Sequence, residues 1–402
     1  MRGKHFRRAS GLVAEIRATN VDPRRLQPAR IYETGADLPP GPRRLGRTAT
    51  AVLMLAVVAL MASGCIVKSG RAEQSRSIGE KVACPIAPDP SIHTSVRIGY
   101  QDIPNGDLIV KDTSVLKTCL PNAKLTWSKF ASGGDVLQGF KARSLDLALL
   151  GSAPASRALS APLDIDMKVI WIQDVIGKAE SLVVHDPSIT TLDQLKGKKI
   201  AVPFASTSHF SLLTALNQAG ITDQVTIMNT QPDAMLAAWG NGIDAAWVWD
   251  PVLSKLKQNG HVIDDSSVTA NQGAPTFDLA GARSDFVAQN GPFLKYWTTV
   301  EDWAVHMINT DPQQAAEHIA AQLSISPALV VPQLAGYQYL SAKDQLGDKY
   351  FGTGAGLPGL AAALLSTASF LHSTADGGGT TVSPAQTYAG ALYSDALKEV
   401  GS

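Results

Sequence analysis

A run of hydroxyl residues is the part of this sequence best suited to chemistry. The segment ASTSH (205–209) separates an apolar strand pattern from an amphipathic helical pattern. Backbone N–H groups at a helix N-terminus, aided by hydroxyls, bind an anion without a full positive charge. We therefore expect Thr207, Ser208 and His209 at an anion site. Helix capping by the hydroxyls, and capping or packing by His209, are the alternatives.

Short apolar runs alternate with helical patterns on either side of this segment. Read as β-strands, the runs are 96–100, 125–130, 145–151, 168–174, 180–184, 199–203, 225–229 and 244–250. Strands separated by helices predict α/β sheets that are mostly parallel and flanked by helices. The sequence from 285 onward is predicted to be mostly helical.

Ligands of open α/β sheets bind at the carboxyl ends of the strands. The residues that follow the predicted strands are therefore candidates, namely 101–104, 132–135, 151–153, 174, 205–209, 249–251 and 273–278. Among them, Gln101 lines the first part of the sheet by position, although it would serve equally well in a turn. The segment containing Ser152 offers a second set of hydrogen-bond donors.

An export signal is predicted at residues 51–65, AVLMLAVVALMASGC, which follow three arginines. A basic segment, an apolar run too short to span a bilayer and small residues before a cleavage site are typical of secretory signals. The box Ala62-Ser63-Gly64-Cys65 resembles a bacterial lipobox, which predicts a lipid anchor on Cys65. An ordinary signal peptide with an incidental cysteine is the alternative.

These features divide the chain before its globular part. Residues 1–64 form an N-terminal extension and signal peptide, and the polar, proline-rich residues 65–94 form a flexible tether. No second apolar run reaches membrane-spanning length, so we expect the protein outside the cytoplasm, held to the outer face of the cell membrane through the lipid only.

Two further cysteines, Cys84 and Cys119, follow the predicted anchor. Outside the cytoplasm, such a pair with no third partner most simply forms a disulfide. Two buried thiols are the alternative.

The charge balance excludes some classes of partner. Lys plus Arg equals Asp plus Glu at 35 each, and neither sign is segregated into long blocks, so nucleic acid is not an expected partner. A small neutral or zwitterionic ligand fits better. The sequence contains no HExxH, GxSxG or CxxC motif, so we expect no catalytic residue, metal or cofactor. No exposed apolar repeat argues against a monomer.

Five segments, taken together, resemble a known family. LDLALLGSAP (145–154), KAESLVV (178–184), GKKIAVPFASTSHFSLLTAL (197–216), GIDAAWVWDP (242–251) and GAPTFD (273–278) are similar to the taurine-binding proteins of bacterial ABC importers. These belong to the sulfonate, nitrate and pyrimidine group of periplasmic binding proteins. The resemblance covers about residues 95–395.

The resemblance implies a two-lobed periplasmic-binding-protein-like fold of type II. Two crossing segments form a hinge between the lobes, which close on the ligand. Lobe 1 would comprise 95–182 plus 282–402, and lobe 2 would comprise 183–281.

The resemblance also implies a site for taurine, a zwitterion with a sulfonate at one end and an ammonium at the other. The hydroxyl turn and Ser152 would hold the sulfonate, and Glu180 and Asp278, on the crossing strands, would hold the ammonium. A structural role at the hinge is the alternative for both carboxylates. Trp249 would contact the ammonium through its π face, or else belong to the core.

The implied function is delivery of a small sulfonate such as taurine to an ABC permease and ATPase. Asp250 departs from the taurine-type pattern, in which a small residue follows Val-Trp, and a Trp-Asp-Pro string is common in alkanesulfonate-binding relatives. Alkanesulfonate, nitrate and a thiamine-type pyrimidine are therefore alternative ligands. An enzyme on the same fold, or a sensor or scaffold lipoprotein, is the alternative from another functional class.

Overall fold

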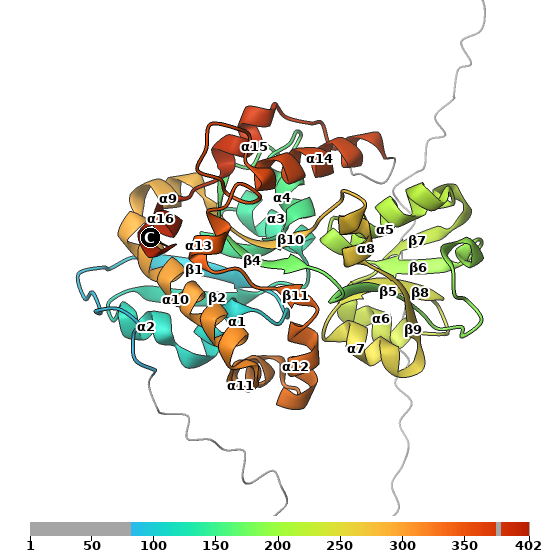
Figure 1. Cartoon of the computed structure of the whole chain (residues 1–402), viewed down its shortest axis with the longest axis horizontal. Coiled ribbons are helices and arrows are strands. Elements are labelled where there is room, and N and C mark those ends of the chain that lie inside the picture. The colour runs from blue at the N-terminus through green and yellow to red at the C-terminus, as the bar shows by residue number, and fades with distance from the viewer. Residues whose placement is uncertain (1–81, 375–378, 402) are drawn as a thin grey trace, which may run out of the picture. The chain divides into compact units, whose positions relative to one another are not determined.

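The computed structural model describes residues 82–374 and 379–401 (Figure 1). The predicted extension, signal peptide and Cys65, and the tether as far as residue 81, lie outside this part of the chain. Within the described residues, no helix has both the length and the apolar composition needed to cross a bilayer.

The described chain contains two β-sheets. The first has the order β11-β4-β10-β3-β1-β2 and consists of β1 (Ser95–Tyr100), β2 (Lys124–Lys129), β3 (Leu147–Gly151), β4 (Met167–Ile176), β10 (Phe277–Arg283) and β11 (Tyr337–Gln338). The second has the order β7-β6-β8-β5-β9 and consists of β5 (Glu180–Val184), β6 (Lys199–Val202), β7 (Thr226–Asn229), β8 (Ala245–Trp249) and β9 (His261–Asp265).

Both sheets are built on one plan. Each has three parallel strands, β2-β1-β3 or β7-β6-β8, followed by an antiparallel strand that enters from the other sheet, β10 or β5. The α/β class and two-sheet architecture are confirmed. The sheets are mixed rather than mostly parallel, because β10 and β5 are antiparallel to both of their neighbours.

The chain passes between the sheets at 177–179 and again at 272–276. The lobe boundaries expected from the sequence, 182/183 and 281/282, fall inside β5 and β10. Pairing assigns the whole of β5 to the second sheet and the whole of β10 to the first, because each strand hydrogen-bonds along its length with the sheet that it enters.

Helices cover both sheets. The helices between β1 and β4 in the chain are α1 (Gly106–Thr113), α2 (Val115–Cys119), α3 (Gly133–Lys141) and α4 (Ser152–Ala158). Those around the second sheet are η1 (Leu192–Leu195), α5 (Thr207–Ala219), η2 (Thr222–Gln224), α6 (Pro232–Ala238), α7 (Val252–Leu256), η3 (Lys257–Asn259) and α8 (Ser266–Asn271). Figure 1 shows α5 and α8 on one face of this sheet and α6 and α7 on the other.

The C-terminal part of the chain is mostly helical, as expected. Its helices are α9 (Ser284–Gln289), α10 (Gly291–Thr310), α11 (Pro312–Leu323), α12 (Pro327–Leu334), α13 (Ala342–Gln345), α14 (Gly359–Ser373), α15 (Ala385–Ala391) and α16 (Asp395–Gly401). They return to the first sheet, to which the short strand β11 also adds.

The central strands are buried on both faces, which explains their nearly continuous apolar sequences. All five residues of β3, β5 and β8 are buried. Side chains that alternate along β5 enter different cores: Leu182 and Val184 pack with Trp247, whereas Val183 belongs to the larger core that extends into the first sheet. The two sheets therefore share part of their apolar packing.

A disulfide joins Cys84 to Cys119, with 5.0 Å between the two Cα atoms. It attaches the segment that precedes β1 to the C-terminal end of α2. A backbone hydrogen bond of 2.9 Å from Asp89 N to Cys119 O lies beside it.

An acidic cluster lies between α1, α10 and β4. Asp107 on α1 and Glu301 on α10 are buried and interact with Gln173 on β4. Burial raises the pKa of Asp107 to about 7, although the nearby side chains of Glu301 and Gln173 oppose the shift. Burial, followed by the Asp107 carboxyl, raises the pKa of Glu301.

This cluster predicts a pH dependence of stability. The folded pKa of Asp107 lies above the unfolded value, so its contribution to stability is fully present below the unfolded pKa and is lost as the pH rises through about 7. An asparagine side chain cannot ionise, so the Asp107→Asn variant does not lose this stability as the pH rises. The difference in unfolding free energy between variant and parent, measured by urea denaturation, should therefore shift in favour of the variant by ~2 kcal/mol from pH 5 to pH 8.

Asp146→Asn is the matched control. Burial would raise the pKa of Asp146, but hydrogen bonds from Arg97 and the charges of Arg97 and Arg283 hold it below its ordinary value. Asp146 is therefore ionised at both pH 5 and pH 8, and Asp146→Asn should lower the unfolding free energy by the same amount at each pH. A difference between Asp107→Asn and the parent that does not change with pH would contradict the prediction.

Candidate functional site

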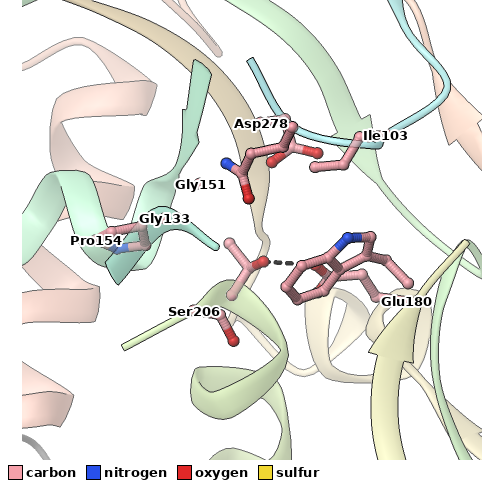
Figure 2. A pocket seen from close by; sticks show the side chains of 10 residues that line it. Ile103, Gly133, Gly151, Pro154, Glu180, Ser206 and Asp278 are labelled. Atoms are coloured by element: carbon pink, nitrogen blue, oxygen red, sulfur yellow. Dashed lines mark hydrogen bonds between the residues drawn. The ribbon is translucent and has the colours of Figure 1, made fainter. Parts of the chain in front are cut away.

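A pocket lies where the carboxyl ends of strands from both sheets meet (Figure 2). The first sheet with its loops and helices contributes six of the ten lining residues, and the second contributes four. The lining residues are Gln101, Ile103, Gly133, Gly151, Pro154 and Asp278 from the first, and Glu180, Ser206, Thr207 and Trp249 from the second. Five of the eight predicted ligand residues therefore line the pocket, namely Gln101, Glu180, Thr207, Trp249 and Asp278.

Helix N-termini form one side of the pocket. Helix α5 begins at Thr207 and α3 begins at Gly133, and both residues line the pocket. The N-terminal end of a helix carries partial positive charge and N–H groups that lack an intrahelical acceptor. This side is therefore suited to an anion.

Ser206 caps α5. Its Oγ accepts a hydrogen bond of 3.1 Å from His209 N and donates one of 2.6 Å to Pro203 O. The cap uses the N–H group of His209, the third residue of the helix, and leaves those of Thr207 and Ser208 in the first turn. Helix capping, the alternative considered for the hydroxyl segment, applies to Ser206.

Thr207 connects this side of the pocket to the first of its carboxyl groups. Its Oγ1 donates a hydrogen bond of 2.5 Å to Glu180 Oε1. Burial raises the pKa of Glu180 to about 7, and the hydroxyls of Thr207, Ser208 and Ser266 oppose that shift. Near neutral pH, Glu180 is therefore present both as the acid and as the carboxylate.

Two more carboxyl groups lie on neighbouring strands. Asp278 on β10 is the Cα partner of Asp174 on β4, and both are buried. Burial, followed by the charges of Asp278 and Glu180, raises the pKa of Asp174 well above its ordinary value. Burial and the charge of Glu180 do the same for Asp278.

No basic side chain of the described residues pairs with these three carboxyl groups. Taking an ionised carboxylate out of water is costly unless a cation or hydrogen-bond donors compensate it. A cation bound beside Glu180 and Asp278, the two that line the pocket, would relieve that cost. This side of the pocket is therefore suited to an ammonium or a similar group.

The two tryptophans of β8 differ in their surroundings. Trp249 lines the pocket and is the Cα partner of Glu180. Trp247 is completely buried in the apolar core of the second sheet. Of the two, only Trp249 can place its π face against a bound cation.

Three predicted ligand residues, Ser152, Ser208 and His209, do not line the pocket. Ser152 Oγ accepts a hydrogen bond of 3.1 Å from Phe277 N, and so attaches the start of α4 to the strand that carries Asp278. Ser208 is buried, and its hydroxyl lowers the pKa of Glu180. Both residues therefore lie behind the wall.

His209 also packs rather than facing the pocket. Its ring stacks on Phe204 with 4.5 Å between ring centroids, and its Nδ1 accepts a hydrogen bond of 3.4 Å from Ala205 N. Burial, together with the charge of Arg157, lowers the pKa of His209 to about 4, so the ring is neutral at physiological pH. Packing, the alternative considered for this residue, describes its position.

Among the wall residues, Pro154 lies outside the candidate segments of the sequence, and Gly151 lies inside one without a predicted role of its own. A methyl group added at Gly151 would lie 2.5 Å from Thr207 Cγ2, so glycine allows the two sheets' elements to approach each other closely. Its position after a predicted strand was a signal for the site. Its contact with Thr207 depends on the tertiary structure.

The pocket is small in this conformation. Its volume is about 10 Å³, which is about the space of one water molecule. A ligand of several non-hydrogen atoms can therefore enter only when the facing elements separate.

Residues 150–315 match the NMT1/THI5 like family. The taurine-binding periplasmic protein of Escherichia coli is 36% identical over 234 residues, which are 56% of this chain and 72% of that protein. A putative aliphatic sulfonates-binding protein of the same organism is 33% identical over 205 residues, 50% of this chain and 63% of that protein.

Solved structures show the same fold. The alkanesulfonate-binding protein of Xanthomonas axonopodis pv. citri bound to MOPS superposes with a TM-score of 0.59 at 22% identity, covering 77% of this chain and 99% of that one. The periplasmic aliphatic sulphonate binding protein of Escherichia coli gives 0.56 at 25% identity, covering 70% and 87%. By sequence and by fold, the chain belongs to the family of the taurine-binding periplasmic proteins, within the NMT1/THI5-like group.

Proposed function

We propose that this protein is an extracytoplasmic solute-binding protein that captures taurine or a closely related small sulfonate and delivers it to the permease and ATPase of an ABC importer. The observation that carries the proposal is the chemical asymmetry of the pocket. Helix N-termini and a hydroxyl form one side, and carboxyl groups without a basic partner form the other.

The sulfonate lies at the start of α5 and α3 in this proposal. Backbone N–H groups of the first turns donate to its oxygens, and the helix ends supply partial positive charge, while Thr207 Oγ1 donates its one proton to Glu180 Oε1. Ser206 keeps the first turn of α5 in place through its cap.

The ammonium lies against Glu180 and Asp278, with the Trp249 ring beside it. Binding ionises carboxyl groups that burial otherwise keeps partly protonated. The cation thus compensates a charge for which the described chain supplies no partner.

Binding without chemical change accounts for this arrangement. Both cysteines of the described chain are joined in the disulfide, which leaves no free thiol there to act as a nucleophile. The two lobes, comprising the first and second sheets with their helices, open to admit the ligand about the segments 177–179 and 272–276 and close on it.

The proposal includes the membrane attachment expected from the sequence. Lipid on Cys65 and a tether that ends before Cys84, which the disulfide attaches to α2, would hold a monomeric binding protein near its permease. The periplasmic names of the relatives support export of this chain from the cytoplasm.

Asp278→Asn tests the ammonium site. The dissociation constant for taurine, measured by isothermal titration calorimetry, should rise by about tenfold or more, because the variant loses a charge-assisted hydrogen bond. Ethanesulfonate, which lacks the ammonium, is the control ligand and should lose less than about threefold. Equal losses for both ligands would refute this role of Asp278, and absence of taurine binding to the parent protein would refute the proposed function.

The affinity for taurine should also depend on pH. The pKa of Glu180 is about 7 in the ligand-free protein, and a bound cation favours the carboxylate, so binding releases protons and weakens as the pH falls below 7. We expect roughly a tenfold rise in the dissociation constant from pH 7.5 to 5.5. Glu180→Gln should bind taurine more weakly at pH 7.5 and show a shallower pH dependence. A parent affinity for taurine that does not change with pH would contradict this account.

Gly151→Ala tests closure of the pocket. The added methyl group would lie 2.5 Å from Thr207 Cγ2 and should raise the dissociation constant for taurine by about tenfold. Thr207→Ser, added to Gly151→Ala, removes the clashing methyl group and keeps the hydroxyl that bonds Glu180, so it should restore much of the affinity. Failure of this second substitution to restore binding would argue against closure by contact between these two residues.

A further inference from the structure

Asp174 is a buried acid for which the proposed taurine site has no use. It lies opposite Asp278 on the adjacent antiparallel strand, so the two side chains point to the same face of the sheet. Its exposed fraction is 0%, and neither of its carboxylate oxygens has a hydrogen-bond partner among the described residues.

Tyr337 on β11 borders the same place. It is the Cα partner of Ile176, two residues after Asp174, and therefore shares its face of the sheet. Its hydroxyl is buried and has no hydrogen-bond partner in the described chain. The neighbouring Tyr339 differs, because its hydroxyl donates a hydrogen bond of 2.6 Å to Pro104 O.

The charged and titratable groups around this place are all acidic or neutral. The charges of Asp174 and Asp278 act on both tyrosines, as does that of Asp250 from the second sheet. Asp250 has its own partners, because its Oδ1 accepts a hydrogen bond of 2.9 Å from Ser254 N and another from Ser254 Oγ. Asp174 and Tyr337 are the groups without a partner.

A single ammonium leaves this part of the site uncompensated. One positive charge lies against Glu180 and Asp278, and Asp174 remains as a third buried carboxyl group. A guanidinium group has a planar set of N–H donors that can bind two carboxylates at once and can stack on an aromatic ring. On the same two-carbon chain as taurine, it reaches about 2 Å further than an ammonium, through two more covalent bonds.

We propose that Asp174 and Tyr337 extend the ammonium site into a site for a larger cationic group, and that the preferred ligand is a small sulfonate that carries a guanidinium. Asp278 and Asp174 accept hydrogen bonds from two edges of the guanidinium, and Tyr337 Oη accepts another. This inference rests on the proposed function, since it concerns the cationic end of the same ligand.

Calorimetric titration of the parent protein with three sulfonates tests the inference without any substitution. The ligands are 2-guanidinoethanesulfonate, taurine and ethanesulfonate, which differ in the cationic group or lack one. The guanidinium compound should bind about tenfold more tightly than taurine. Equal or weaker binding of the guanidinium compound, with taurine bound, would overturn this inference and leave the proposed function intact. No binding of any of the three would overturn both.

Asp174→Asn then assigns the preference to a residue. The variant should bind 2-guanidinoethanesulfonate about tenfold more weakly than the parent and should change its affinity for taurine by less than about threefold. Tyr337→Phe, which removes only the hydroxyl, should reduce the same preference by a smaller factor. Equal effects of Asp174→Asn on both ligands would contradict the assignment.

Proton release supplies a measurement that a merely structural role of Asp174 would not change. At pH 6, titrations in buffers of different ionisation enthalpy count the protons released on binding. The guanidinium compound should release more protons than taurine from the parent protein, because it ionises one more carboxyl group, and this excess should disappear in Asp174→Asn. An equal count for both ligands in the parent would contradict the inference.

Discussion

The burial of carboxyl groups without a basic partner is the constraint on which this site depends. Glu180, Asp278 and Asp174 are removed from water, and their mutual repulsion adds to the cost of ionising them. In the proposed function, a ligand cation beside Glu180 and Asp278 would offset this cost, and an uncharged ligand would not.

The plan of the two sheets brings the carboxyl groups together. Glu180 begins β5 and Asp278 is the second residue of β10, so each lies where the chain has just entered a new sheet. Both strands are antiparallel to the strands beside them, and their first residues therefore lie next to the carboxyl ends of those neighbours. Each segment that crosses between the sheets thus leads directly to a carboxyl group that lines the pocket.

The other side of the pocket depends on helix ends and on the absence of a side chain. Ser206 caps α5, and Thr207 then bonds Glu180, so the groups suited to an anion and to a cation are held by one turn of chain. Gly151 lets this turn approach the end of β3. Ser152 and His209 lie behind these lining residues, where Ser152 Oγ accepts a hydrogen bond from Phe277 N and the His209 ring stacks on Phe204.

The sequence by itself predicted the strands β1 to β8 with the helical patterns between them, the hydroxyl turn at 205–209 and, through the family resemblance, the candidacy of Glu180 and Asp278. These follow from local patterns: apolar periodicity, residues at strand ends, and motifs that can be read along the chain. Only the tertiary structure decided that Thr207 faces the pocket while His209 packs on Phe204, that Trp249 is a wall and Trp247 is core, and that Asp174 lies opposite Asp278. The direction of a side chain and the pairing of distant strands depend on contacts between segments far apart in sequence, and no local pattern encodes them.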